Sequence, residues 1–253
     1  MRKPLLLLTL VSAAVLTSCG KPQDEDDTTR FSVLGDSYSA FLGYVTPETN
    51  SAWYGPTPLD TIIDVTNVED MWWYKVAVAK EWVLDHNNSF TGGTICNLED
   101  YDVRSYFLWR MDNLGDPNVI FVFGGTNDVW YEAPLGDYVY ENWTEEQLQS
   151  FRPALAYLFV GLSRLYPKAK VHFMLDMNLG EGYGVDWAMR QEYIESIRQI
   201  TAHLSVSASS CTTSIRYGTI PRCRAWTPSP TKCLQLWTKD SIPEAVTDGQ
   251  LVV

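Results

Sequence analysis

The hydrophobic positions of this chain fall into short apolar runs that alternate with amphipathic stretches. Phe31 to Leu34, Val119 to Phe123 and Val171 to Leu175 are apolar without polar alternation, which is typical of strands covered on both faces. The segment from Asn88 to Ile95, which contains two adjacent glycines, predicts a further short strand and turn. These runs predict the strands of a sheet that is buried between other elements.

Three stretches between or after these runs have the period of a helix. Asn67 can cap a helix that runs to about Leu84. A capping box at Thr144 precedes an apolar stripe from Phe151 to Leu165, in which Pro153 breaks or restarts the helix. The range 186–204 predicts the third helix. Because strand and helix alternate, we expect an α/β fold, a three-layer α/β/α domain around a mostly parallel, flavodoxin-like sheet.

The alternating pattern ends at Leu204. A fifth strand is due there, but Ser205 to Ser214 is mostly Ser, Thr, Ala and Cys, with no apolar run. The net charge is −14 before residue 205 and +2 after it. We therefore expect one domain over 31–204 and an aberrant tail over 205–253 that does not behave as part of it.

The first residues predict export and lipidation. Two basic residues precede an apolar run from Leu5 to Leu16, which is too short to span a bilayer and is typical of a signal peptide. Leu16 to Cys19 resembles the lipobox of bacterial lipoproteins. This predicts a signal peptide over 1–18, acylation of Cys19, and an acidic tether over 19–30. The expected location is the cell envelope, with a lipid anchor in the membrane and display on the outer surface.

Charge and cysteine usage narrow the range of functions. The net charge is −12 and no cluster of Lys and Arg occurs, which argues against nucleic acid as a partner. Cys96 stands alone, and Cys211, Cys223 and Cys233 lie near the end without the spacing of a metal site. We expect no metal and no cofactor.

Three polar motifs follow the predicted strands. Gly35-Asp36-Ser37 leaves the first strand, residues 88–94 follow the second, and residues 124–128, Gly-Gly-Thr-Asn-Asp, leave the third. The carboxyl ends of parallel strands share one edge of a sheet, so these motifs are expected to meet there. A purely structural alternative is that Ser37 caps the next helix and Asn127 closes a turn.

With these motifs in this order, the chain resembles the SGNH hydrolases, the GDSL-type esterases and lipases, over about Phe31 to Leu204. The resemblance implies that Ser37 is the nucleophile. It also implies that the Ser37 and Gly92 N–H groups and the Asn127 side-chain amide form the oxyanion hole. Such a hole needs donors fixed in advance, and a glycine and a neutral amide suit that task. No Gly-x-Ser-x-Gly elbow occurs, which argues against the α/β-hydrolase fold.

Acidic and aromatic side chains near these motifs have two interpretations each. Asp36 and Asp128 are expected to hold the loops by accepting backbone N–H bonds rather than to react. Five large aromatic residues could line a pocket for a sugar or an acyl group. Trp130, beside the Asn127 loop, is the best candidate for that role. The five are Trp53, Tyr54, Trp72, Trp73 and Trp130, of which the helical spacing of Trp72 and Trp73 favours the core instead.

The chain has three histidines, and none is expected near Ser37. His86 is expected between the first helix and the second strand, and His203 at the end of the last helix, which places both at the opposite edge of the sheet. His172 comes four residues before the end of its strand, about 13 Å from the active edge. In the family the base follows the fifth strand in an Asp-x-x-His motif, and this chain has no such motif.

A change of reading frame would explain the missing base. Thr219 to Pro230, back-translated and read from the third base, can encode His-Pro-Thr-Leu-Pro-Gly-Met-Asp-Ala-Ile-Thr, which resembles the closing block of the family. Trp226 has a single codon, which supplies the last two bases of the Met codon in that block without any choice of codon. The hypothesis is that the sequence after about Leu204 is read out of frame.

The sequence therefore predicts a serine esterase or acylhydrolase that cleaves an ester, such as acetyl groups on carbohydrate, through an acyl-enzyme on Ser37. The alternative is a catalytically inactive surface lipoprotein that binds glycans with the same cleft. A purely structural lipoprotein would leave the three motifs unexplained. The expected partners are a small-molecule or glycan ester and, through the anchor, a membrane.

Overall fold

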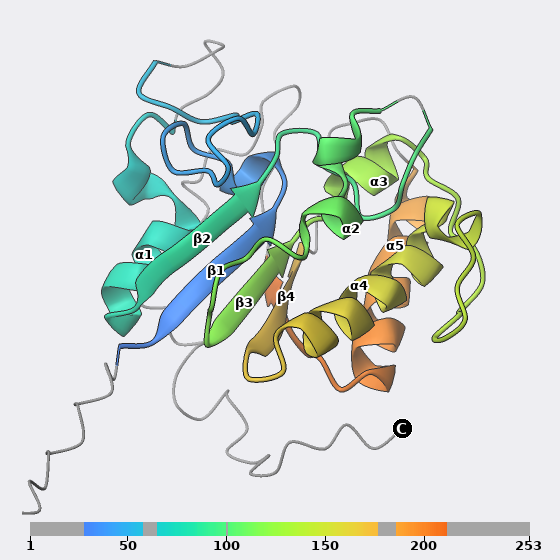
Figure 1. The fold of residues 1–253 in the computed structure, drawn as a ribbon. Coiled ribbons are helices and arrows are strands. Elements are labelled where there is room, and N and C mark those ends of the chain that lie inside the picture. The colour runs from blue at the N-terminus through green and yellow to red at the C-terminus, as the bar shows by residue number, and fades with distance from the viewer. Residues whose placement is uncertain (1–27, 58–64, 100, 177–185, 212–253) are drawn as a thin grey trace, which may run out of the picture.

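A five-stranded parallel sheet forms the centre of the molecule (Figure 1). The computed structural model describes residues 28–57, 65–99, 101–176 and 186–211. Within them the strand order is β2-β1-β3-β4-β5, and every pair is parallel. This is the flavodoxin-like order that the alternating pattern predicted. The strands are β1 (Arg30–Gly35), β2 (Val83–Ser89), β3 (Val119–Phe123), β4 (Lys170–Asp176) and β5 (Ser207–Cys211).

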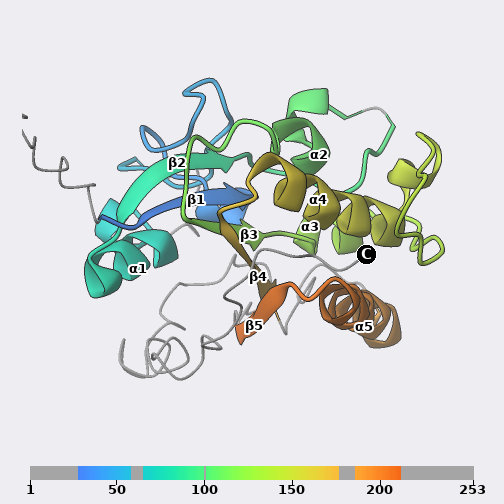
Figure 2. The ribbon, with the colours of Figure 1, turned by 60° about the horizontal axis from the view of Figure 1, so that its bottom comes forward.

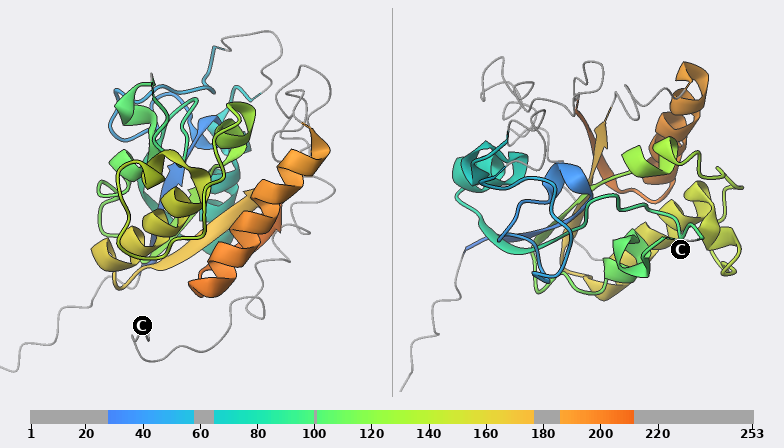
Figure 3. Two further views of the ribbon diagram at one scale, coloured as in Figure 1. Left: turned by 90° about the vertical axis from the view of Figure 1, so that its right-hand side faces the viewer. Right: turned by 90° about the horizontal axis from the view of Figure 1, so that it is seen from above.

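Helices cover both faces of the sheet, which confirms the three-layer architecture (Figures 2 and 3). The α-helices are α1 (Trp72–Lys80), α2 (Phe107–Arg110), α3 (Thr126–Trp130), α4 (Phe151–Leu165) and α5 (Trp187–His203). Short 3₁₀ turns are η1 (Ser37–Ser39), η2 (Val68–Asp70), η3 (Val103–Ser105) and η4 (Gln147–Gln149). Helix α1 packs on one face, while α2, α4 and α5 pack on the other.

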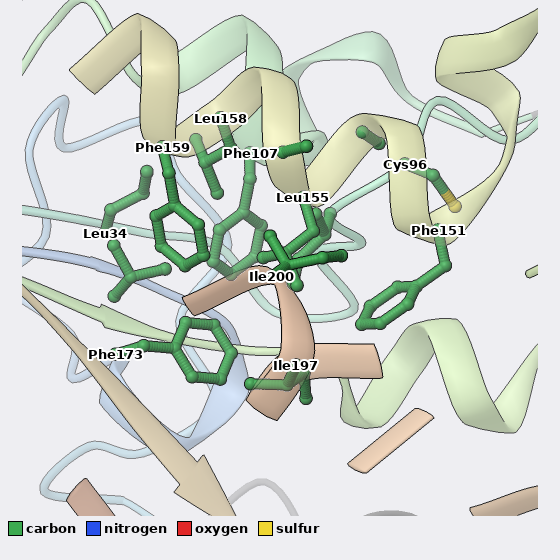
Figure 4. Packing of buried hydrophobic residues seen from close by; sticks show 14 of the residues in the cluster. Leu34, Cys96, Phe107, Phe151, Leu155, Leu158, Phe159, Phe173, Ile197 and Ile200 are labelled. Carbon is green, nitrogen blue, oxygen red and sulfur yellow. The ribbon is translucent and has the colours of Figure 1, made fainter. Parts of the chain in front are cut away.

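Side chains alternate between the two faces of the sheet along each strand, so the buried hydrophobic residues form two clusters, one on each face. In β3, Phe121 and its neighbours two positions away face α1, whereas Ile120 and Val122 face α4 and α5. Successive side chains of a strand point to opposite faces, so a continuous apolar run supplies both cores at once. Figure 4 shows the second core, where Phe173 from β4 and Phe159 from α4 come together, with ring centroids 5.7 Å apart.

The expected boundary between the first helix and the second strand was wrong. Helix α1 ends at Lys80, and Glu81 adopts the left-handed conformation that terminates helices, with φ 56°. Strand β2 begins at Val83, so the sequence from Val83 to Asn87, which is mostly polar, is strand. It can be polar because β2 is an edge strand, held by its backbone bonds to β1.

The expectation that no strand follows Leu204 was also wrong. Ser207–Cys211 forms β5 and pairs in parallel with β4, with His172 opposite Ser207 and Asp176 opposite Cys211. An edge strand needs the backbone ladder more than an apolar run, which explains why a segment of small residues can pair here. The domain therefore continues past residue 204 to at least the end of β5.

The two long helices follow their predicted patterns closely. The Thr144–Gln147 capping box forms, with reciprocal hydrogen bonds of 3.0 and 3.3 Å, but it closes the turn that leads into η4, and α4 starts afterwards. Pro153 lies in the first turn of α4, where a missing N–H does no harm. Asp186 caps α5 through the Ala188 N–H, at 2.8 Å.

Within the described ranges, no helix combines the length and the apolar character that a membrane span requires. Cys19, the predicted signal peptide and most of the acidic tether lie outside the described residues, as does the tail after residue 211.

Candidate active site

The three sequence motifs meet at the carboxyl edge of the sheet. They leave β1, β2 and β3, which are neighbours in the sheet. Backbone hydrogen bonds join them beyond the strand ends: the Asp36 N–H donates to the Phe123 carbonyl at 3.2 Å, and the Phe90 N–H donates to the Gly35 carbonyl at 3.1 Å. The loops therefore continue the sheet for one residue, which fixes their positions relative to one another.

Ser37 is the first residue of η1 and is partly exposed. The Asp36 carboxylate caps this turn by accepting the Tyr38 N–H at 3.0 Å. The indole N–H groups of Trp72 and Trp73 each donate at 3.0 Å to Ser39, the first to its Oγ and the second to its carbonyl. These two tryptophans are buried, as their helical spacing favoured, and they support the turn that carries Ser37.

Gly35 must be glycine at this turn. A Cβ atom at residue 35 would lie 2.6 Å from the Ser89 Oγ and 2.7 Å from the Ser39 Cβ. Contacts that short would force β1 away from β2. The missing side chain lets the backbone before Ser37 lie directly against the neighbouring strand.

Hydrogen-bond donors gather around the loops from β2 and β3. Among the described residues, neither the Ser37 N–H nor the Gly92 N–H donates a hydrogen bond. Gly92 has φ 79°, a left-handed conformation that glycine adopts without strain. The Asn127 Nδ2 donates to the Gly93 carbonyl at 2.8 Å. That bond uses one of the two amide hydrogens of Asn127 and ties the second and third motifs together.

Asp128 anchors the loop that carries Gly92. Its buried carboxylate accepts the Ile95 N–H at 2.9 and 3.0 Å, the Cys96 N–H at 3.0 Å, and the Cys96 thiol at 3.1 Å. Burial raises the pKa of Asp128, and the backbone N–H bonds oppose that rise. Asp36 and Asp128 thus both accept backbone N–H bonds, in agreement with the loop-holding role expected of them.

A buried charge beside these loops was not found by sequence reasoning. Arg110, at the end of α2, donates to the Ser105 carbonyl at 3.0 Å and to the Asn88 carbonyl. Burial lowers the pKa of Arg110 to about 9. Burial also raises the pKa of Asp36 to about 7, although the Tyr38 N–H bond and the Arg110 charge act in the opposite direction. No motif marks Arg110, because its partners lie in other loops.

The three histidines lie away from Ser37. His86 lies inside β2 rather than before it, and its backbone N–H donates to the Ser32 Oγ at 3.2 Å. Ser32 is five residues before Ser37, about 16 Å away along β1. His172 in β4 is level with Phe121 of β3 and is buried, and burial lowers its pKa to about 4. His203, the last residue of α5, stacks on Tyr140 with centroids 3.8 Å apart.

An aromatic stack borders the loop of Gly92. Trp130, which is 46% exposed at the end of α3, stacks on Tyr131 with centroids 5.1 Å apart. Tyr131 also contacts Tyr101, with centroids 4.6 Å apart. A Cβ atom at Gly92 would lie 3.9 Å from the Tyr131 hydroxyl, which places the stack beside this motif. Of the other aromatics considered, Tyr54 is buried in the core and Trp53 packs against it.

No cluster of His, Cys, Asp and Glu within the described ranges has the arrangement of a metal site. The groups that these loops bring together are one hydroxyl, two backbone N–H groups and one side-chain amide. They suit the stabilisation of negative charge on an oxygen atom.

Comparison with known proteins assigns the family. The model of the GDSL-like lipase/acylhydrolase family matches residues 29–212. A structure from Bacteroides ovatus assigned as a GDSL-like lipase is 38% identical, with a TM-score of 0.73, over 83% of this chain and 97% of that chain. A second, from Bacteroides uniformis and assigned in the same way, is 35% identical, with a TM-score of 0.71, over 85% and 95%.

More distant similarity extends to a carbohydrate esterase, which is 16% identical with a TM-score of 0.53, over 83% of this chain and 69% of that chain. At that identity the likeness concerns the fold. No curated protein matches the sequence. The family model covers most of the chain, and the two Bacteroides structures match nearly along their whole length. The chain therefore belongs to the GDSL-like lipase/acylhydrolase family, the SGNH hydrolases.

Proposed function

We propose that the protein is a serine esterase in which Ser37 is the nucleophile. The observation that carries the proposal is the pair of N–H groups, on Ser37 and Gly92, that donate no hydrogen bond among the described residues. Both residues are partly exposed, and two donors left open on neighbouring loops beside a serine are available to an oxygen atom of a ligand.

The proposed first step is attack of the Ser37 Oγ on the carbonyl carbon of an ester. The carbonyl oxygen becomes an anion and accepts hydrogen bonds from the Ser37 N–H, the Gly92 N–H and the second amide hydrogen of Asn127. A base takes the proton of the Ser37 hydroxyl during the attack and passes it to the alkoxy oxygen as the intermediate collapses, so that the alcohol leaves and an acyl-enzyme remains on Ser37. Water then hydrolyses the acyl-enzyme through a second intermediate, which the same donors stabilise.

The alcohol that leaves is proposed to be part of a carbohydrate. The stack of Trp130, Tyr131 and Tyr101 offers a large aromatic surface beside Gly92, and aromatic faces pack well against the C–H faces of a sugar ring. A short acyl group such as acetyl would then lie at Ser37. We further propose that Cys19 carries a lipid anchor, which would place this activity at the surface of a bacterial membrane.

Attack by Ser37 needs a base, and none of the three histidines lies near the hydroxyl. That observation favours a second candidate function, in which the chain is an inactive lipoprotein that binds glycans with the same cleft. It also motivates the proposal that the base is encoded downstream in another reading frame. Hydrolysis of 4-nitrophenyl acetate by the full chain separates an esterase from a binding protein.

The experiment that tests the nucleophile is labelling with a fluorophosphonate. We expect the protein with the restored reading frame, which would supply the base, to be labelled, and Ser37→Ala in that protein should lose all labelling. Ser51→Ala removes an exposed serine from a nearby loop and serves as the matched control, which should label as wild type does. Labelling that survives Ser37→Ala would exclude Ser37 as the nucleophile.

A further inference from the structure

A cavity of about 320 Å³ lies beside β2, at the edge of the sheet. Its walls come from the loop before Ser51, from the end of β2, and from the segment that includes α2. Ser37, Gly92 and Asn127 are not among the residues that line it. Its polar, charged and aromatic lining residues include Asn50, Asn88, Arg104, Trp109, Arg110, Asp112 and Asn113.

Two buried asparagines form a fixed polar wall of the cavity. The Asn50 Nδ2 donates to the Asn88 Oδ1 at 2.8 Å and to the Ser89 carbonyl at 3.1 Å. The Asn88 Nδ2 donates to the carbonyls of Arg110 and Asn113, at 3.1 and 3.0 Å. The Oδ1 of Asn50 accepts no hydrogen bond from a described residue. The wall therefore holds one oriented acceptor whose other bonds keep it in place.

Another part of the cavity lining is aromatic and exposed. Trp109 in α2 is 61% exposed, and its neighbours Asp112 and Asn113 are exposed as well. A large indole in water next to a polar hollow costs solvation unless a ligand covers it. The side chains of Asp112 and Asn113 add hydrogen-bonding groups at the rim.

The charges that line the cavity are balanced. Arg104 forms a bidentate ion pair with Asp102, with N–O distances of 2.6 to 3.0 Å. Arg110 is buried, and its guanidinium is bonded to backbone carbonyls rather than left for an anion. What remains is a set of amides, one carboxylate and an aromatic face. That combination matches a neutral polyhydroxylated ring, whose hydroxyls bond to amides and carboxylates and whose C–H face packs on an indole.

We propose that this cavity binds a neutral sugar unit. Asn88 pairs with Leu34, which is three residues before Ser37, so the cavity wall lies on the order of 10 Å from the serine. That distance suits a sugar unit of the same glycan chain that presents its ester to Ser37. The role in ester cleavage rests on the proposed function, whereas the binding itself does not.

The test is calorimetric titration of the full-length protein with xylohexaose and with cellohexaose, and with hexagalacturonate as an anionic comparison. We expect at least one neutral hexasaccharide to bind, and Trp109→Ala to weaken that binding roughly tenfold. Asp112→Ala, a change of an exposed side chain, should weaken it severalfold. Trp187→Ala is the matched control, because Trp187 is 59% exposed and lies on α5, near the opposite edge of the sheet.

Three results would overturn the proposal. One is the absence of binding to both neutral hexasaccharides, and another is binding that Trp109→Ala leaves unchanged. The third is binding that Trp130→Ala abolishes while Trp109→Ala does not, because the sugar would then occupy the cleft beside Gly92. Failure of Ser37 to react with a fluorophosphonate would refute the proposed function and leave the binding result intact.

Discussion

Asp128 is predicted to be the main structural support of the Gly92 loop, and its replacement should cost stability as well as function. Asp128→Ala removes the acceptor of two buried N–H groups, those of Ile95 and Cys96. Each buried donor left without a partner costs about 1–3 kcal/mol, which gives a loss of roughly 2–6 kcal/mol. Burial raises the pKa of Asp128, so removing this carboxyl also relieves a desolvation cost. The expected net loss is about 2–4 kcal/mol in the free energy of unfolding.

Urea unfolding followed by tryptophan fluorescence measures this loss, since the chain contains 10 tryptophans. Asp137→Ala removes an exposed carboxylate from the same connecting region and should change the free energy by less than about 0.5 kcal/mol. Asp128→Asn keeps one acceptor oxygen and should lose about half as much as Asp128→Ala. If Asp128→Ala and Asp137→Ala unfold at the same urea concentration, the hydrogen bonds from the Ile95 and Cys96 N–H groups to Asp128 do not hold the loop, and the reasoning fails.

Four further predictions concern catalysis, pH, anchoring and the gene. In the form of the chain that hydrolyses 4-nitrophenyl acetate, Asn127→Ala should lower kcat about 100- to 1,000-fold with little change in KM; a pure KM effect would make Asn127 a substrate-binding group only. Because folding raises the pKa of Asp36 from 3.8 to about 7, its contribution to stability is complete below pH 3.8 and is lost as the pH rises to 7. In Asp36→Asn the urea midpoint should therefore fall less steeply between pH 3.8 and 7 than in the wild type. The same pH dependence in both proteins would contradict a raised pKa of Asp36. Cys19→Ser should move the protein from the membrane fraction to the soluble fraction, and continued membrane attachment would exclude a lipid anchor at this residue. Sequencing the gene across codons 200 to 230 should reveal a frame change after about codon 204, and the protein from the restored frame should gain esterase activity; an early stop in that frame would refute the idea.

The sequence predicts the central strands well and the edge strands poorly. Strands β1, β3 and β4 are buried on both faces, so their apolar runs are unambiguous. Strands β2 and β5 are the two edges, each with one neighbour, and their polar or small residues carry no comparable signal. Their positions depend on pairing with residues far along the chain, which a local pattern cannot reveal.

The same division applies to the candidate site. Ser37, Gly92 and Asn127 could be proposed as site residues from the sequence because each belongs to a motif at the end of a predicted strand and the motifs resemble those of the family. The sequence did not predict the hydrogen bond from Asn127 to Gly93 or the placement of Arg110 near Asp36, because each depends on how separate loops fold over the sheet edge. The cavity beside β2 was missed for the same reason, because its walls come from three separate segments.

The backbone bonds from Asp36 to Phe123 and from Phe90 to Gly35 carry the sheet's hydrogen-bond ladder into the loops that bear Ser37 and Gly92. Amide protons in such a ladder exchange with solvent only when the ladder opens. The Asp36 and Phe90 amides should therefore exchange as slowly as those of the neighbouring strands. The start of the serine turn then opens together with the sheet rather than as an independent loop.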